Sequence, residues 1–250
     1  MTLDILICTI DEGILRVPHV LMPPADGISY VVSMQYTSPP KQSLVPPVLN
    51  ERGDVTLTLL EGRGLSRNRN NAILHSKGDV LLMADDDCRY TPELIAHIFE
   101  AYAQHPEADV IHFQAQDLEG HPLHPYPASF VSSVELTFRR TVTTRFDERF
   151  GLGSQFCSGE EQVWMKAARQ AGHTILYVPQ PIVQTPSGTS GSQFLGSPAQ
   201  QRSKGAMFHV VYGTAGALWR TAKEARWWLV HRRANPLPIV ANMIKGILES

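Results

Sequence analysis

Apolar and polar residues follow one another along the first half of the chain in blocks that predict strands and helices in turn. The run at 79–84 is continuously apolar, as in a strand that is covered on both faces. Further strands are predicted at 3–10, 28–36, 54–61 and 108–116. This alternation predicts an α/β fold, in which helices flank both faces of a mainly parallel sheet.

Two helices are predicted between these strands. The first begins near Leu65, with Ser66 as a candidate cap, and ends at Gly78. The second spans 91–106, where Thr91 is placed to cap the helix and Pro92 takes its first position. Its apolar residues fall on one stripe, which predicts a face packed on the sheet: Leu94, Ile95, Ile98, Phe99 and Tyr102.

The rhythm loosens after residue 120. A proline-broken loop is predicted at 121–127, a strand at 132–140, a helix at 159–172 and a strand at 173–179, followed by a glycine- and serine-rich loop at 186–198. From about residue 199 the pattern is helical. We therefore expect an α/β domain over 1–195 and a helical C-terminal extension over 196–250.

Composition narrows the class of protein. The 250 residues carry a net charge of −2, which gives no reason to expect nucleic acid as a partner. The three cysteines are far apart, so neither a disulfide framework nor a zinc knuckle is expected, and a cytoplasmic, reducing compartment fits best. The first apolar stretch is short and interrupted by Asp4, which is typical of a first strand and not of a signal peptide.

Three consecutive carboxylates, Asp85, Asp86 and Asp87, follow the buried strand at 79–84. Ligands of open α/β sheets bind outside the carboxyl ends of the strands, where this cluster is expected to lie. Adjacent acids repel one another, and a hard divalent cation such as Mg²⁺ relieves that repulsion. A solvated acidic loop is the competing interpretation, because charge runs are usually solvated.

A basic segment, "GRGLSRNRNN" at 62–71, precedes the acidic cluster. It places Arg63, Arg67 and Arg69 at a predicted helix start, where phosphate is favoured. No GK[ST] follows the glycines, so the segment is not a P-loop. Without other evidence, these would be ordinary surface arginines.

Together, "GLSRNRNNAI…GDVLLMADDDCRYTP" resembles the central signature of GT-A fold glycosyltransferases, particularly the inverting family 2 enzymes. The segment "RFDERFGLGSQFCSGEEQVWMKAARQAG" at 145–172 continues the resemblance, and "YVPQPIV" resembles the strand that follows. The motifs stand in the family's order over roughly 1–190. The resemblance implies a Rossmann-like, mixed and mainly parallel sheet flanked by helices.

The resemblance also implies roles for individual residues. Glu161 matches the catalytic base, and Glu160 and Gly153 fall on the acceptor side. Asp87 is the favoured metal ligand, assisted by Asp85 or Asp86, with Mn²⁺ or Mg²⁺ as cofactor. The nucleotide sugar is assigned to Thr9, Asp11, Glu12, Gln35, Arg69, Asp85 and Asp86. For the two glutamates, complementarity to the helix dipole remains an alternative.

Two departures from the family pattern concern specificity and metal binding. The family's D-D-G-S after the second strand is replaced by "VVSMQYTS", so Gln35 or Ser33 would have to contact the base. The family's metal-binding histidine after the last core strand is replaced by Gln184 or Thr185. Other histidines remain as candidate ligands: His112, His121, His124 and His209.

The expected activity is metal-dependent, inverting transfer of a sugar from a nucleotide-diphosphate sugar, favouring a UDP-sugar, to a hydroxyl of a glycan or lipid-linked acceptor. Polysaccharide biosynthesis is one setting for such a reaction. Three alternatives are a nucleotidyltransferase, a non-catalytic sugar-nucleotide-binding protein and a nucleic-acid-binding module. Against the first, this chain lacks the glycine-rich basic loop that nucleotidyltransferases carry after the first strand. The missing histidine and D-D-G-S favour the second, and the near-neutral charge argues against the third.

The C-terminal segment "RTAKEARWWLVHRR" combines aromatic and basic residues. Trp227 and Trp228 beside arginines and lysine suit the inner face of an anionic membrane, with peripheral binding. Packing of the tryptophans against the protein is an equal alternative.

Overall fold

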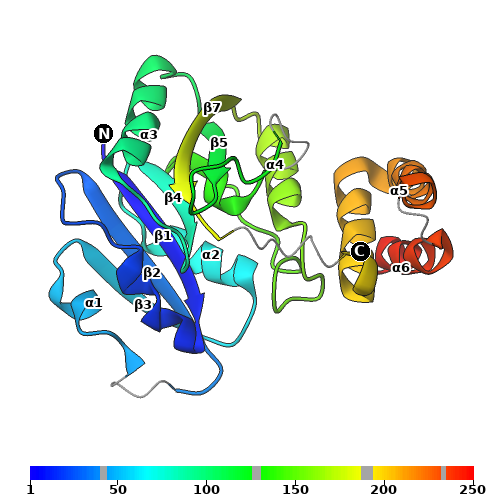
Figure 1. The fold of residues 1–250 in the computed structure, drawn as a ribbon, viewed down its shortest axis with the longest axis horizontal. Coiled ribbons are helices and arrows are strands. Elements are labelled where there is room, and N and C mark those ends of the chain that lie inside the picture. The colour runs from blue at the N-terminus through cyan, green and yellow to red at the C-terminus, as the bar shows by residue number, and fades with distance from the viewer. Residues whose placement is uncertain (40–43, 126–130, 187–193, 232–234) are drawn as a thin grey trace. The chain divides into compact units, whose positions relative to one another are not determined.

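The computed structural model describes all residues except 40–43, 126–130, 187–193 and 232–234 (Figure 1). The backbone forms two compact units. The first comprises Met1–Arg63, Arg67–Arg145 and Ala167–Ser187, and the second comprises Gly64–Ser66, Phe146–Lys166 and Gly188–Ser250. The division into 1–195 and 196–250 stays a prediction.

The first unit is built on a seven-stranded sheet in the order β3-β2-β1-β4-β6-β5-β7. All neighbouring strands are parallel except β6, which runs antiparallel to β4 and β5. The mainly parallel, mixed sheet predicted from the sequence is therefore confirmed. The strands are β1 Leu3–Ile10, β2 Ile28–Tyr36, β3 Val55–Glu61, β4 Val80–Asp85, β5 Val110–Gln116, β6 Leu136–Arg139 and β7 Ile175–Gln184.

Two segments differ from the predicted strands. The first half of the predicted strand at 132–140 is a 3-10 turn, Ser133–Glu135 (η4), so only four residues of β6 join the sheet. A capping box explains the turn: Glu135 Oε2 accepts the backbone N–H of Ser132 at 2.9 Å. Strand β7 continues to Gln184, past its predicted end at 179.

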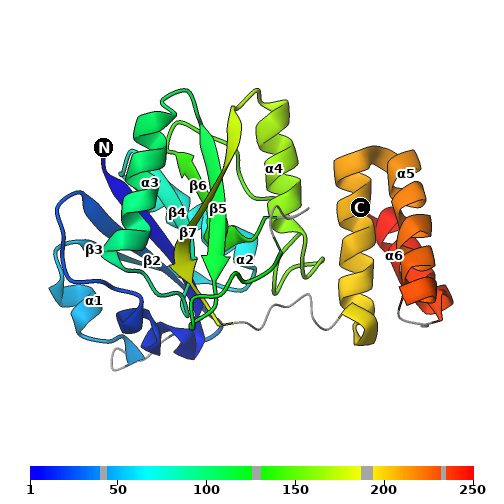
Figure 2. The same cartoon turned by 45° about the horizontal axis from the view of Figure 1, so that its top comes forward.

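Helices cover both faces of the sheet (Figure 2). Helix α3 (Pro92–Gln104) packs Ile95 and Ile98 into the cluster that contains Val32 of β2. Helix α2 (Leu65–His75) bonds to Ser33, whose side chain points to the other face because successive strand residues alternate. Shorter turns fill the remaining connections: η1 Asp11–Leu15, η2 Val17–His19 and α1 Val48–Glu51.

Of the two predicted helix caps, Thr91 is confirmed and Ser66 is wrong. Thr91 Oγ1 accepts the N–H of Leu94 at 3.3 Å, so the predicted cap of α3 is confirmed. Ser66 does not cap α2. It lies inside the first turn, fully buried, and its hydroxyl has no hydrogen-bond partner among the described residues.

The C-terminal part is helical, as predicted. Helix α5 (Pro198–His231) is kinked at Gly213, where φ is 70°, and α6 (Pro236–Glu249) follows it. A shared core joins the two helices: Phe194, Phe208, Ala217, Ile239, Met243 and Ile247. Most of the predicted loop at 186–198 falls outside the described residues. No described helix is both long and apolar enough to cross a membrane.

Candidate functional site

The carboxyl ends of β1, β2 and β4 meet at one edge of the sheet because these strands are parallel neighbours. Cys8 pairs in register with Asp85, and Ile10 pairs with Gln35. The predicted donor-side residues of three distant sequence segments are thus brought to the same edge, as the α/β pattern requires.

Asp86 ties the end of β4 to the turn that follows β1. Its Oδ2 accepts a short hydrogen bond from the Thr9 hydroxyl, and its Oδ1 accepts two from Arg16, at 3.0 Å from Nε and 2.7 Å from Nη2. The close approach depends on Gly13, because a Cβ there would collide with both Asp86 Oδ2 and Thr9 Oγ1. Asp86 therefore serves first as a structural anchor of the edge.

Asp85 lies beside a buried arginine. Arg69 is only 2% exposed, and its Nη2 donates to Ser133 Oγ at 2.7 Å and lies 3.8 Å from Asp85 Oδ1. A guanidinium at this distance attracts the carboxylate and orients it. Arg69 consequently faces Asp85, and its predicted contact with a diphosphate stays a prediction.

Asp87 is the most exposed of the three acids. No described side chain forms a hydrogen bond with it. The residue is exposed as a whole, but partial desolvation of its carboxyl and the neighbouring Asp86 charge raise the pKa of Asp87 above its ordinary value. Such crowding is what a bound divalent cation relieves, and carboxylate oxygens are the donors that Mg²⁺ and Mn²⁺ accept. The residues present therefore fit a hard cation at Asp87.

A hollow of about 160 Å³ opens beside Asp86 and Asp87. This volume is below the usual size of small-molecule pockets and suits an ion or a phosphate group. Three basic residues line it that the sequence did not single out, namely Arg16, His19 and Arg89. Arg89 directly follows the acidic cluster and could have been noticed, whereas Arg16 and His19 carry no local signal.

The predicted residues Asp11 and Glu12 lie in the turn after β1. Asp11 adopts a left-handed conformation with φ of 48°, which aspartate tolerates better than most residues. Its carboxylate accepts the N–H of Thr37 at 3.0 Å, so it holds the end of β2. Glu12 is exposed.

A buried polar network connects α2 to this edge. Asn68 Nδ2 donates to the carbonyl of Thr9 at 2.9 Å, and Asn68 Oδ1 accepts the Ser33 hydroxyl at 2.6 Å. Asn71 Nδ2 donates to Ser33 Oγ at 2.8 Å. The asparagines of "SRNRNN", for which no role was predicted, thus hold in place the helix that carries Arg69.

Two residues of β2 were candidates for contacting a base. Ser33 is fully buried and committed to Asn68 and Asn71, so it cannot reach a ligand. Gln35 is 2% exposed, and its Nε2 has no hydrogen-bond partner among the described residues. A buried donor without a partner is unfavourable, so Gln35 is the stronger candidate.

None of the four candidate histidines is grouped with Asp87 as a metal ligand in the described part of the chain. His112 stacks on Tyr177 with 5.0 Å between ring centroids, and burial lowers its pKa to about 4. His124 Nε2 lies 3.0 Å from Glu135, and His209 Nδ1 lies 2.8 Å from Ser250 Oγ. These contacts explain the three histidines as packing residues.

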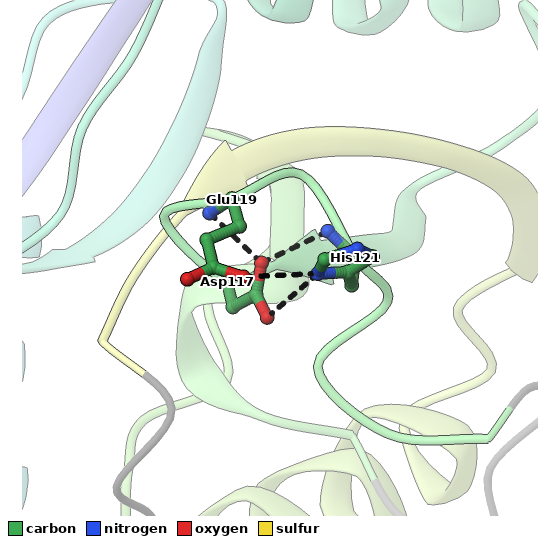
Figure 3. A group of neighbouring side chains, drawn as sticks. All are labelled: Asp117, Glu119 and His121. Atoms are coloured by element: carbon green, nitrogen blue, oxygen red, sulfur yellow. Dashed lines mark hydrogen bonds and ion pairs between the residues drawn. The ribbon is translucent and has the colours of Figure 1, made fainter.

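The fourth histidine, His121, belongs to a tight turn after β5 with Asp117 and Glu119 (Figure 3). Asp117 Oδ1 accepts the backbone N–H groups of Glu119 and His121 at 2.9 Å each, and the bond from His121 is the main cause that lowers the pKa of Asp117. His121 Nδ1 lies 3.4 Å from Asp117 Oδ2. These three residues could hold a cation, but the turn's own hydrogen bonds account for their proximity.

Gln184 and Thr185, which replace the family's metal-binding histidine, have backbone partners at the observed end of β7. The backbones of Gln184 and Arg89 bond to each other in both directions, at 2.8 and 3.0 Å. The N–H of Thr185 donates to the carbonyl of Gln116 at 2.9 Å. A role of either residue in binding metal stays a prediction.

In the second unit, Glu160 and Glu161 begin helix α4 (Glu160–Gln170). Glu160 is buried, whereas Glu161 is half-buried. The preceding Gly159 has φ of 101°, and a Cβ there would lie 2.9 Å from Met207 Cβ. Gly153 lies in an exposed turn with φ of 79°, and the neighbouring carbonyl of Leu152 accepts the N–H of Leu65 at 2.9 Å.

The comparisons with known proteins agree with this geometry. The family model "Glycosyl transferase family 2" matches residues 43–159, a segment that contains Arg69 and the three aspartates and ends immediately before Glu160. No curated protein matches the sequence.

Two solved structures share the fold. TarS 1–349 of S. aureus in complex with UDP-GlcNAc is 14% identical, with a TM-score of 0.60, over 99% of this chain and 82% of that one. The mannosyltransferase PcManGT of Pyrobaculum calidifontis, in complex with GDP-Man and Mn²⁺, is 13% identical, with a TM-score of 0.58, over 99% and 86%. Residues 43–159 therefore match a glycosyltransferase family 2 domain, and the fold is the GT-A fold that the motifs indicated.

Proposed function

We propose that the protein transfers a sugar, with inversion, from a nucleotide-diphosphate sugar to a hydroxyl of a glycan or lipid-linked glycan, and that it requires a divalent cation. The proposal rests on the different contacts of the three aspartates at the end of β4. Asp86 is bonded to Thr9 and Arg16, and Asp85 lies beside Arg69. Asp87 is exposed and forms no hydrogen bond with a side chain of the described residues.

Asp87, assisted by Asp85, would hold Mn²⁺ or Mg²⁺. When bound, such an ion would offset the negative charge that develops on the leaving diphosphate. Arg16 and Arg89 line the hollow beside these acids and supply further positive charge there. Arginine is well suited to bind phosphate oxygens, which supports a diphosphate in this hollow.

Gln35 would contact the base of the nucleotide. Its amide offers both a donor and an acceptor, and Nε2 has no partner among the described residues. Uracil presents a carbonyl beside an N–H, which an amide can match. The match is compatible with a UDP-sugar, and because thymine and guanine present the same pair of groups, dTDP- and GDP-sugars must be compared directly. Thr9, Asp11 and Glu12 are proposed to border the nucleotide from the end of β1.

Glu161 would act as the general base for the acceptor hydroxyl. Its half-buried position at the start of α4 is compatible with substrate access, whereas Glu160 is buried beside it. The deprotonated acceptor oxygen attacks the anomeric carbon from the face opposite the diphosphate, forming one bond as the other breaks. A single displacement inverts the configuration and needs no second nucleophile. Gly153 and Glu160 are proposed to shape the acceptor side.

A donor screen tests this function. Purified protein is incubated with UDP-, GDP- and dTDP-sugars, with Mn²⁺, Mg²⁺ or excess chelator, and released nucleotide is measured with and without glycan acceptors. UDP-GlcNAc and GDP-mannose are the first donors to use, because the structures of TarS and PcManGT contain them. We expect metal-dependent release that Asp87→Asn abolishes.

The screen also separates the alternatives. Saturable binding of a nucleotide sugar without turnover, over all acceptors, would favour a non-catalytic binding protein. Formation of a nucleotide sugar from a nucleoside triphosphate and a sugar phosphate would favour a nucleotidyltransferase. Full activity in excess chelator would exclude the metal-dependent mechanism.

A further inference from the structure

One face of α5 beyond the kink packs against other residues of the C-terminal part. Trp228 stacks on Phe194 with 5.5 Å between ring centroids, and its Nε1 donates to Glu224 Oε1 at 2.9 Å. Glu224 also pairs with Lys204 at 2.8 Å. Of the two adjacent tryptophans expected at a membrane, Trp228 therefore belongs to the interior.

The opposite face of this helix is apolar and exposed. Trp219 is 59% exposed, Leu229 56% and Val230 60%. Together with Ala222, which is also exposed, these residues recur at the three- and four-residue spacing that places them on one side of a helix. Large apolar side chains gathered on one exposed face indicate an interaction surface.

The charge on this outward face has one sign. Lys223 and Arg226 are exposed, and Lys223 Nζ lies 4.6 Å from the ring centroid of Trp219. Glu224 is the single acid between residues 212 and 231, and it is turned inward to Lys204 and Trp228. No described acid pairs with Lys223 or Arg226, so the surface combines apolar contact area with positive charge and is complementary to an anionic partner.

We propose that this outward face of α5, formed by Trp219, Ala222, Lys223, Arg226, Leu229 and Val230, binds the surface of a membrane that contains anionic lipid. A helix lying in the interface would bury its apolar residues below the headgroups, while lysine and arginine extend to the lipid phosphates. Tryptophan is the side chain best suited to this boundary. Pairing of the same face with a second copy is disfavoured, because it would bring Lys223 and Arg226 of both copies together without an acid.

This surface lies outside the residues proposed for sugar transfer, so lipid binding and transfer can be measured separately. The full chain is floated in density gradients with two kinds of vesicle: phosphatidylcholine alone, and phosphatidylcholine mixed with phosphatidylglycerol. We expect the protein to float with the anionic vesicles, to remain unbound with the neutral ones, and to be released as salt is raised.

Substitutions at exposed positions assign the effect to this face. Each unit of charge near an anionic surface changes binding about fivefold, so Arg226→Glu, which changes two units, should weaken binding about 30-fold. The double variant Trp219→Ala/Val230→Ala should weaken it at least about tenfold. The matched controls are Leu74→Ala, at the end of α2, and Lys77→Glu, just beyond it. Both variants should bind vesicles like the native protein.

Three results would overturn the proposal: equal flotation with neutral and anionic vesicles, native binding by both α5 variants, or no binding at low salt. A dimer in light scattering without vesicles that Trp219→Ala dissociates would instead assign the face to a second copy. The melting temperatures of all variants should match that of the native protein, because the substituted side chains are exposed. Flotation measures lipid binding directly, so its result does not depend on whether the donor screen detects transfer.

Discussion

Replacing Gly13 with alanine is the most direct test of how the acidic edge is built. The added methyl group would occupy space already taken by Thr9 Oγ1 and Asp86 Oδ2. Relief requires Asp86 to swing away, which breaks its bond to Thr9 and disturbs its pair with Arg16. Because Asp86 stands between Asp85 and Asp87, the whole cluster should move with it.

The size of the effect follows from these contacts. A hydrogen bond to a charged group contributes about 1.5–3 kcal/mol. The Arg16 pair adds at most about 1 kcal/mol, because the arginine side chain is 59% exposed and screened by solvent. Alanine recovers about 0.4–1 kcal/mol by restricting the unfolded chain. We therefore expect the free energy of unfolding to fall by about 0.5–3.5 kcal/mol.

The assay combines thermal unfolding with ligand titration. For a chain of this length, 1 kcal/mol shifts the melting temperature by about 2–4 °C, so the expected decrease is about 1–14 °C. Titration calorimetry with nucleotide and Mn²⁺ should show weaker binding. Gly53→Ala is the matched control, since no atom lies within 4 Å of the added Cβ, and it should leave both quantities nearly unchanged.

A second substitution makes the reasoning refutable. Thr9→Ala removes the hydroxyl that the new methyl group would strike, so the double variant Gly13→Ala/Thr9→Ala should lose less stability than the sum of the single variants. If Gly13→Ala melts and binds like Gly53→Ala, the edge does not depend on this close approach and the anchoring role of Asp86 is wrong.

Three further predictions concern metal, chemistry and the C-terminal helices. Asp87→Asn should abolish Mn²⁺ binding measured by electron paramagnetic resonance. Because desolvation and Asp86 raise the pKa of Asp87, protons compete with Mn²⁺ at a higher pH than they would at an ordinary carboxylate. The affinity for Mn²⁺ should therefore fall as the pH decreases through that raised pKa. Glu161→Gln should slow transfer about 10²–10⁴-fold with little change in donor affinity. If Glu160→Gln slows transfer more than Glu161→Gln does, the general base is Glu160. Gly246→Ala would strike the carbonyl of Arg202 and should lower the free energy of unfolding by about 1–3 kcal/mol in denaturant titrations without changing donor affinity.

Periodicity alone predicted most of the sheet and the helices. Strands β1 and β2 match their predicted ranges, because short, mostly apolar segments rich in Ile and Val favour a strand even where single polar residues interrupt them. The prediction failed at 133–135, where a capping box formed by Ser132 and Glu135 overrides the apparent strand alternation. It also failed at Ser66, because a hydroxyl near a helix start caps the helix only if it lies outside the first turn.

The sequence by itself determined the kind of chemistry at the edge of the sheet. Three adjacent aspartates after a buried strand specify a carboxylate cluster at a strand end, since strand direction places that end with the neighbouring ones. What each aspartate contacts was decided only by the tertiary structure. Arg16 lies 70 residues from Asp86 and meets it because the turn after β1 closes over the end of β4. Hydrogen bonds between distant segments depend on the path of the whole chain, which no local pattern encodes. Those bonds make Asp86 an anchor of the edge and leave Asp87 exposed.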